Sequence, residues 1–234
     1  MSSLHESFSA GYACLSAWAD LLDRINVFPV ADGDTGTNLR ISLTPLRNPA
    51  DHSSTIEKRL AFCATGNSGN IAAAFFQEFC QARSFADLAQ YSASGREKAW
   101  QAIAEPCRGT MLSVFDSLAS SLGSLHEIDS VFEPLCSALQ EAVFESTQLL
   151  PDCTKAGVVD SGALAMYVFF DGFFAHLTAQ PPAKMSLLDT FKGKLVISKD
   201  FIPKTTENHC IDAIVRKDDE QELSRAGLAQ LGES

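Results

Sequence analysis

Apolar residues recur every three or four positions through the first 180 residues, and this spacing constrains the fold more than any other feature of the chain. Phe8, Tyr12, Leu15, Trp18 and Leu22 place one apolar stripe on a helix over residues 4–24. Seven further helices are predicted: one that opens near Thr37, and then residues 54–64, 70–82, 94–106, 109–122, 128–150 and 161–177. No convincing strand pattern interrupts them, so this part of the chain is predicted to be all-α.

The character of the sequence changes after residue 180. Pro181 and Pro182 predict a linker, residues 194–198 and 210–216 predict short strands, and residues 218–234 predict a helix. A segment of this size cannot bury a core of its own. We therefore expect a helical domain over residues 1–180 and, over 181–234, a linker followed by a short α/β segment that opens a second, truncated domain.

Charge and composition exclude several classes of partner. The net charge of −11 argues against nucleic acid and anionic membranes. The apolar run over 162–177 contains Asp171 and is too short to span a bilayer, so no integral membrane contact is expected. The N-terminus has no signal-peptide pattern, and no two cysteines have CxxC spacing, so free thiols and a cytoplasmic location are expected.

Polar, glycine-containing loops precede alternate helices. They read DGDTGTN (residues 32–38), ATGNSGN (64–70), EPCRGT (105–110) and AGVVDSGA (156–163). For any one loop, helix capping is the simpler explanation. In an up-and-down array, however, alternate helices begin at the same end, so the four loops are expected to meet. Helix N-termini and glycine backbone together favour a bound phosphate.

The first loop also carries Asp32 and Asp34, which would repel a bare phosphate. Mg²⁺ resolves this conflict because it prefers carboxylate oxygens and commonly bridges them to nucleotide phosphates. No Walker motif and no kinase glycine-rich loop is present in the sequence. The prediction is therefore a site for one or two Mg²⁺ ions and ATP or ADP in a fold unlike those two nucleotide-binding classes.

The segments INVFPVADGDTGTN, ATGNSGN, EPCRGTMLSV and AGVVDSGALAM, in this order, resemble the Dak-type domain of the dihydroxyacetone kinase L-subunit family over about residues 5–180. The NVFP sequence before DGDTGTN is most similar to the N-terminal domain of fatty acid kinase A and to DegV-associated Dak proteins. Residues 207–234 resemble the start of the middle domain of those proteins.

The resemblance implies an eight-helix antiparallel up-and-down barrel that binds Mg-ATP or Mg-ADP at one rim. It also implies transfer of the γ-phosphoryl group to a substrate that a partner presents. In the fatty acid kinases this substrate is an acyl carboxylate on a DegV-like fatty-acid-binding protein. In the dihydroxyacetone (glycerone) kinases it is a triose on a dihydroxyacetone-binding subunit or domain.

Carried over by position, Asp32 and Asp34 match metal-binding residues at the reacting phosphate, and Asn26 stands nearest to a third aspartate of the dihydroxyacetone branch. The residues expected to contact nucleotide are Thr35, Thr37, Asn38, Asn67, Ser68, Gly69, Gly109, Thr110, Met111, Asp160 and Gly162. Two positions depart from the fatty acid kinase pattern: Thr65 replaces its usual arginine and Arg108 its usual glutamate. Either change could alter partner docking or nucleotide contacts.

Three alternatives stay open at the level of sequence. The acceptor could be a triose, although the NVFP form argues against that branch. The domain could bind ADP or ATP without catalysis and regulate a DegV-like partner. It could also be a plain helical domain with no affinity for nucleotide.

Overall fold

The computed structural model describes residues 4–48, 53–124, 132–180 and 187–203, and within these ranges the chain forms helices and connecting loops without a β-strand. The longer helices are α1 (Leu4–Arg24), α2 (Thr35–Ser42), α3 (Ser53–Cys63), α4 (Gly66–Phe79), α5 (Leu88–Gln101), α6 (Met111–Ser124), α7 (Phe132–Leu149) and α9 (Ser161–Leu177). The shorter ones are the 3-10 turns η1 (Thr44–Arg47) and η2 (Phe85–Asp87), with α8 (Pro151–Ala156) and α10 (Leu187–Thr190).

The prediction of an all-α domain is confirmed for these residues, and each of the eight predicted helices has a counterpart. The largest difference is in α5, which begins at Leu88 and ends at Gln101, well before Pro106. Its early start has a local cause. The carboxylate of Asp87 accepts hydrogen bonds from the backbone N–H and the hydroxyl of Ser84, at 2.9 and 3.0 Å. This capping interaction starts η2, which leads directly into α5.

The predicted strand over residues 194–198 is wrong. This segment makes two backbone hydrogen bonds to the loop before α9: Val159 N–H donates to Lys194 O at 3.1 Å, and Ser198 N–H donates to Ala156 O at 2.8 Å. A short loop cannot extend this pairing into a β-ladder. Phe191 and Leu195 are buried in the same hydrophobic core as the helices. The predicted strand over 210–216 and the helix over 218–234 lie outside the described residues.

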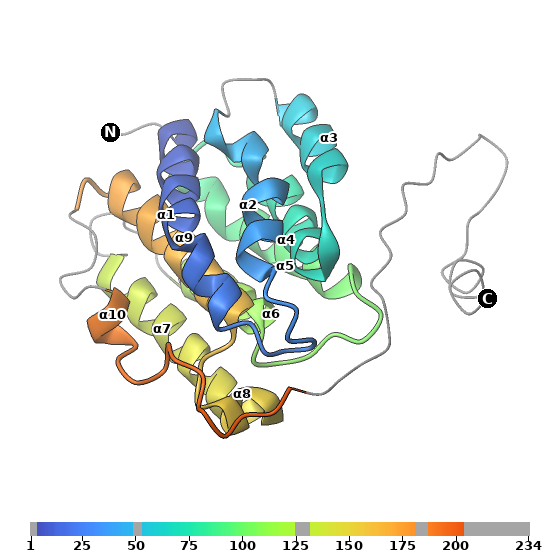
Figure 1. Ribbon diagram of the computed structural model, residues 1–234. Helices are drawn as coiled ribbons and strands as arrows, with labels where there is room; N and C mark the ends of the chain where they lie inside the picture. Colours follow the sequence, from blue (N-terminus) through green and yellow to red (C-terminus); the bar gives the residue numbers. More distant parts are fainter. Residues whose placement is uncertain (1–3, 49–52, 125–131, 181–186, 204–234) are drawn as a thin grey trace, which may run out of the picture. The chain divides into compact units, whose positions relative to one another are not determined.

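The helices pack side by side in a closed ring. Contacts run from α1 to α2, α4, α5, α6, α7 and α9, and α9 then packs along α1 in the most extensive helix pair of the fold. Figure 1 shows α1 and α9 side by side over most of their length. Helix α9 also contacts α2 and α6, so it lies toward the interior. Of its residues, only Asp171 and His176 are not buried.

Phenylalanine rings fill the interior. Phe75 of α4 stacks on Phe115 of α6 with ring centroids 4.0 Å apart, and Phe170 of α9 contacts both rings edge-on. The described helices include none that is long and apolar enough to cross a membrane. The six cysteines in the described ranges are free thiols, as expected.

The close approach of α1 and α9 depends on Gly11. A methyl group at this position would lie 2.7 Å from Phe169 O and 3.0 Å from its ring. Because a backbone atom cannot move aside cheaply, we expect Gly11→Ala to lower the free energy of unfolding by about 2 kcal/mol. Gly123→Ala in α6 is the matched control, since its methyl group would meet nothing within 4 Å and should stabilise the helix by about 0.5 kcal/mol. Urea unfolding of both variants checks the pair; equal losses would contradict the packing account.

Candidate functional site

The loop between α1 and α2 presents two carboxylates to solvent. Asp32 and Asp34 are exposed and flank Gly33, whose φ of +72° permits the tight turn between them. Asn26 is buried below them. Its Nδ2 donates to Asp32 Oδ1 at 2.6 Å, and its Oδ1 accepts from Ser161 Oγ at 3.5 Å. Both ends of the Asn26 amide therefore bond to protein groups, and one of them orients Asp32.

Sequence reasoning missed Asp23. The side chain of this residue accepts from Thr37 twice: from the backbone N–H to Oδ1 at 3.0 Å and from the hydroxyl to Oδ2 at 2.7 Å. These bonds tie the last turn of α1 to the first turn of α2. Asp23 lies in the last turn of α1, where the helix dipole disfavours a negative charge. This unfavourable position was the one sign in the sequence that Asp23 has a specific role.

The carboxylates of this loop repel one another. Desolvation raises the pKa of Asp34, the side-chain bond to Asn38 opposes that rise, and the charges of Asp32 and Asp23 add to it. Exposed carboxylate oxygens that repel one another have the chemistry of a site for a hard cation. In the described ranges no three or more His, Cys, Asp or Glu side chains are already grouped in a way that could hold a metal ion.

The second loop packs against the first turn of α2 and the residues beyond it. Thr65 N–H donates to Ser42 Oγ at 3.0 Å. Gly66 has a φ of +65°, and a methyl group there would lie 2.6 Å from Asn38 Nδ2. Gly69 is buried against Ser42, whereas Asn67 is exposed and Ser68 is half-buried at the start of α4. The loop is therefore held close to Asn38, and its polar side chains remain accessible.

The third loop is capped by Thr110. Its hydroxyl donates to Cys107 O at 2.8 Å and accepts from Leu112 N–H at 3.3 Å, while Gly109 N–H donates to Ser113 Oγ at 2.8 Å. Met111 begins α6 and is buried. The hydroxyl of Thr110 is thus used to start the helix, as the capping explanation of this loop expects.

The fourth loop buries a carboxylate. Asp160 is 4% exposed, and its Oδ2 accepts from Ala163 N–H at 2.8 Å at the start of α9. Its own backbone N–H donates to Ser146 Oγ at 2.9 Å. Burial raises the pKa of Asp160 to about 7, although the N–H groups of Ala163 and Gly162 partly offset this rise. Asp160 is therefore a carboxyl group that titrates near neutral pH.

Contacts join the four loops. Asn38 meets Gly66 between the first and second loops, and Asn26 bonds to Ser161 between the first and fourth. A methyl group on Gly162 would lie 2.9 Å from the Met111 Cε, so the start of α6, directly after the third loop, lies against the fourth loop. In Figure 1 the loops before α2, α6 and α9 lie at the lower end of the helices. Every predicted site residue lies in this region, and the role of each remains a prediction.

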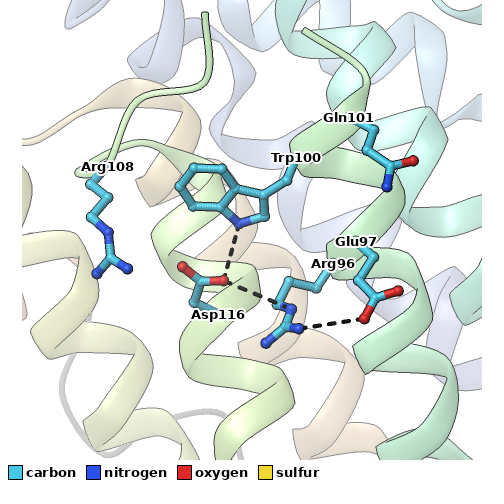
Figure 2. Close-up of a pocket in the computed structure, with 6 residues that line it drawn as sticks. All are labelled: Arg96, Glu97, Trp100, Gln101, Arg108 and Asp116. Atoms are coloured by element: carbon cyan, nitrogen blue, oxygen red, sulfur yellow. Dashed lines mark hydrogen bonds and ion pairs between the residues drawn. The ribbon is translucent and has the colours of Figure 1, made fainter.

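A depression of about 410 Å³ lies beside the third loop. It is lined by Arg96, Glu97, Trp100, Gln101, Arg108 and Asp116 (Figure 2). Asp116 Oδ1 accepts from Trp100 Nε1 at 3.0 Å and lies 4.0 Å from Arg96 Nε, and Arg96 also pairs with Glu97 at 3.7 Å. The lining of the depression therefore carries two positive and two negative side chains, with no net charge. It shares only Arg108 with the four loops, which remain the candidate site.

Comparisons with known proteins agree on one family. A family model described as the DAK2 domain matches residues 29–175, a range that contains all four loops. An uncharacterized protein of Staphylococcus saprophyticus is 31% identical over 98% of the chain, and one of Staphylococcus haemolyticus is 32% identical over 94%. Protein YloV of Bacillus subtilis is 27% identical over 98%. The chain spans about half the length of these relatives, namely 47%, 45% and 47%.

Proposed function

The chain belongs to the DAK2 domain family, and from this we propose that it is the Mg-nucleotide-binding domain of a kinase that phosphorylates a substrate held by a partner protein. The observation that carries the proposal is the joining of four glycine-containing loops around one pair of exposed aspartates. A plain helical domain has no need to gather these loops, since each helix can be capped separately.

The order of helix contacts favours the antiparallel barrel expected for such a domain. Neighbours in the ring keep the order of the chain, with α3 passed over between α2 and α4 and α8 between α7 and α9, and α9 closes the ring on α1. Such a ring brings alternate helix starts to the same rim. The barrel therefore gives a structural reason why loops far apart in the sequence form one site.

Phosphoryl transfer requires mainly that the reactants are positioned and that phosphate charge is neutralised. Different residues of the four loops would serve these two roles. Asp32 and Asp34 would hold Mg²⁺, which neutralises phosphate charge when it is bound. Asn26 orients Asp32, and Asp23 fixes the start of α2 through Thr37. The starts of α4 and α6 would face the phosphates with backbone N–H groups, and positive φ angles at Gly66 and Gly109 allow close approach.

The acceptor that we propose is an acyl carboxylate on a DegV-like fatty-acid-binding protein. The NVFP form of the first motif favours this choice over a triose. The aspartate that the dihydroxyacetone branch uses is replaced by Asn26, which bonds to Asp32 here. A triose acceptor or a regulatory domain that only binds nucleotide are the alternatives.

A transfer assay separates these possibilities. The chain is mixed with ATP, Mg²⁺ and either a fatty-acid-loaded DegV-like protein or a dihydroxyacetone-binding subunit with its triose, and ³¹P NMR follows the products. We expect acyl phosphate and ADP with the first partner. Glycerone phosphate with the second would assign the triose branch. Tight ADP binding with no product from either partner would favour the regulatory alternative.

A further inference from the structure

Residues 187–201 form a strap that the helical domain does not need for closure of its ring of helices. Phe191 anchors the strap and is fully buried. Its ring contacts Phe144 of α7 at a centroid distance of 4.8 Å and Tyr167 of α9 at 5.4 Å. Gly193, with a φ of +77°, then turns the chain, and Lys194 N–H closes the turn on Phe191 O at 2.9 Å.

After this turn, the strap backbone forms hydrogen bonds with the end of α8 and the loop between α8 and α9. Lys194 O accepts from Val159 N–H at 3.1 Å, and Ser198 N–H donates to Ala156 O at 2.8 Å. These two bonds enclose the residues that lead into Asp160. Val159 is completely buried, so the bond to Lys194 O is the partner that its N–H has in place of water, and departure of the strap would break that bond.

The other bonds of this loop come from α7 and α8. Val158 N–H donates to Cys153 O at 3.2 Å, and Asp160 N–H donates to Ser146 Oγ at 2.9 Å. Loss of the strap would therefore free one side of the loop and leave the start of α9 in place. The expected consequence is a local shift next to Asp160 and Gly162, without unfolding of the domain.

We propose that the strap positions the Asp160 loop for nucleotide, with Phe191 as the positioning residue. This inference rests on the proposed nucleotide-binding function. Phe191 packs on Phe144 and Tyr167, and its effect on Asp160 would pass through the backbone bond between Lys194 and Val159. Residues 187–201 would thereby help to shape the site around Asp160.

The test compares three variants of the full chain. Phe191→Ala removes the anchor, Phe191→Leu keeps most of its volume, and Val196→Ala is the matched control because Val196 lies in the same strap and is 80% exposed. Titration calorimetry measures Mg-ADP affinity, and NMR hydrogen exchange measures protection of the Val159 amide. For Phe191→Ala we expect about tenfold weaker binding and loss of protection at Val159. Phe191→Leu should restore both, and Val196→Ala should match the natural chain.

Unchanged affinity in Phe191→Ala, with Val159 exchanging freely, would overturn the inference and leave the strap a purely structural element. If Phe191→Ala does not fold, the variant Gly193→Ala tests the inference in its place. It strains the turn at a positive φ without opening the core, since its methyl group would meet nothing within 4 Å, and the same loss of affinity is expected. Absence of Mg-ADP binding by the natural chain would refute the proposed function itself, a result distinct from normal binding that Phe191 does not influence.

Discussion

Asp160→Asn is expected to make the protein more stable than the natural chain at pH 8 and to leave it about equally stable at pH 4. The cause is the burial that raises the pKa of Asp160 from an ordinary value of 3.8 to about 7. Burial removes the carboxylate from water, so the ionised form is disfavoured in the folded state.

The sign follows from proton binding. Between pH 4 and pH 7 the folded protein holds a proton on Asp160 that the unfolded chain has released. The stability that this proton gives is fully present below the unfolded pKa and is lost as the pH rises through about 7. The complete loss is on the order of 4 kcal/mol. Asparagine caps a helix about as well as aspartate and does not titrate, so it removes this loss.

Urea unfolding of both proteins from pH 4 to pH 8 measures the effect as the difference between the two curves. Asp87→Asn is an informative control because hydrogen bonds from Arg83 and Ser84 lower the pKa of Asp87. That carboxylate stabilises the fold above its unfolded pKa, and the contribution is lost as the pH falls, so its variant should differ in the opposite direction. Parallel curves for Asp160→Asn and the natural chain would show that burial does not raise the pKa of Asp160.

Asn26→Asp is expected to destabilise the metal-free protein by about 3 kcal/mol and to make its stability depend on Mg²⁺. Asn26 is 4% exposed and donates to Asp32 at 2.6 Å. A carboxylate in its place would lose that hydrogen bond and bring a second negative charge against Asp32. A cation between the two would relieve the repulsion, and binding to the folded state alone raises stability by mass action.

Thermal unfolding with Mg²⁺ and with EDTA tests this prediction. The exchange variant Asn26→Asp/Asp32→Asn is the matched control, since it retains one carboxylate and one amide in the pair. It should lose less stability and recover less with Mg²⁺ than the single variant. If Mg²⁺ restores nothing to Asn26→Asp, the pair of residues does not lie beside a cation site.

Much of the helical fold is predictable because the signal is repeated. The apolar stripe of α1 and the almost continuously apolar sequence of α9 each run for several turns, and the predicted ranges 4–24 and 161–177 agree with the structure. Short elements lack this repetition. Helix α8 has one and a half turns starting at Pro151, and such a stretch has no readable period. Residues 194–198 have strand-like composition, but in the described structure their backbone bonds go to the end of α8, the loop before α9 and neighbouring turns, and not to a strand.

The candidate site was predictable where chemistry and loop position coincide. Asp32, Asp34 and Asp160 stand out because they precede helices and lie within two residues of a glycine. Asp23 does not, because it lies within the last turn of α1 and its importance comes from a contact with Thr37. The strap was missed for a similar reason: Pro181 and Pro182 indicate a linker, and nothing local reveals that Phe191 returns to the core.

We propose that the four loops form one site for nucleotide that depends on a divalent cation. Titration calorimetry of ATP and ADP, with Mg²⁺ and with EDTA, tests it on the natural chain stripped of nucleotide carried through purification. The matched variants are Asp32→Ala/Asp34→Ala and Glu97→Ala, the latter an exposed carboxylate on α5. We expect Mg²⁺-dependent binding that the double variant weakens at least about 100-fold, with its helical circular dichroism intact and with Glu97→Ala unaffected. Absence of binding under every condition, or equal binding by the double variant, would contradict the claim.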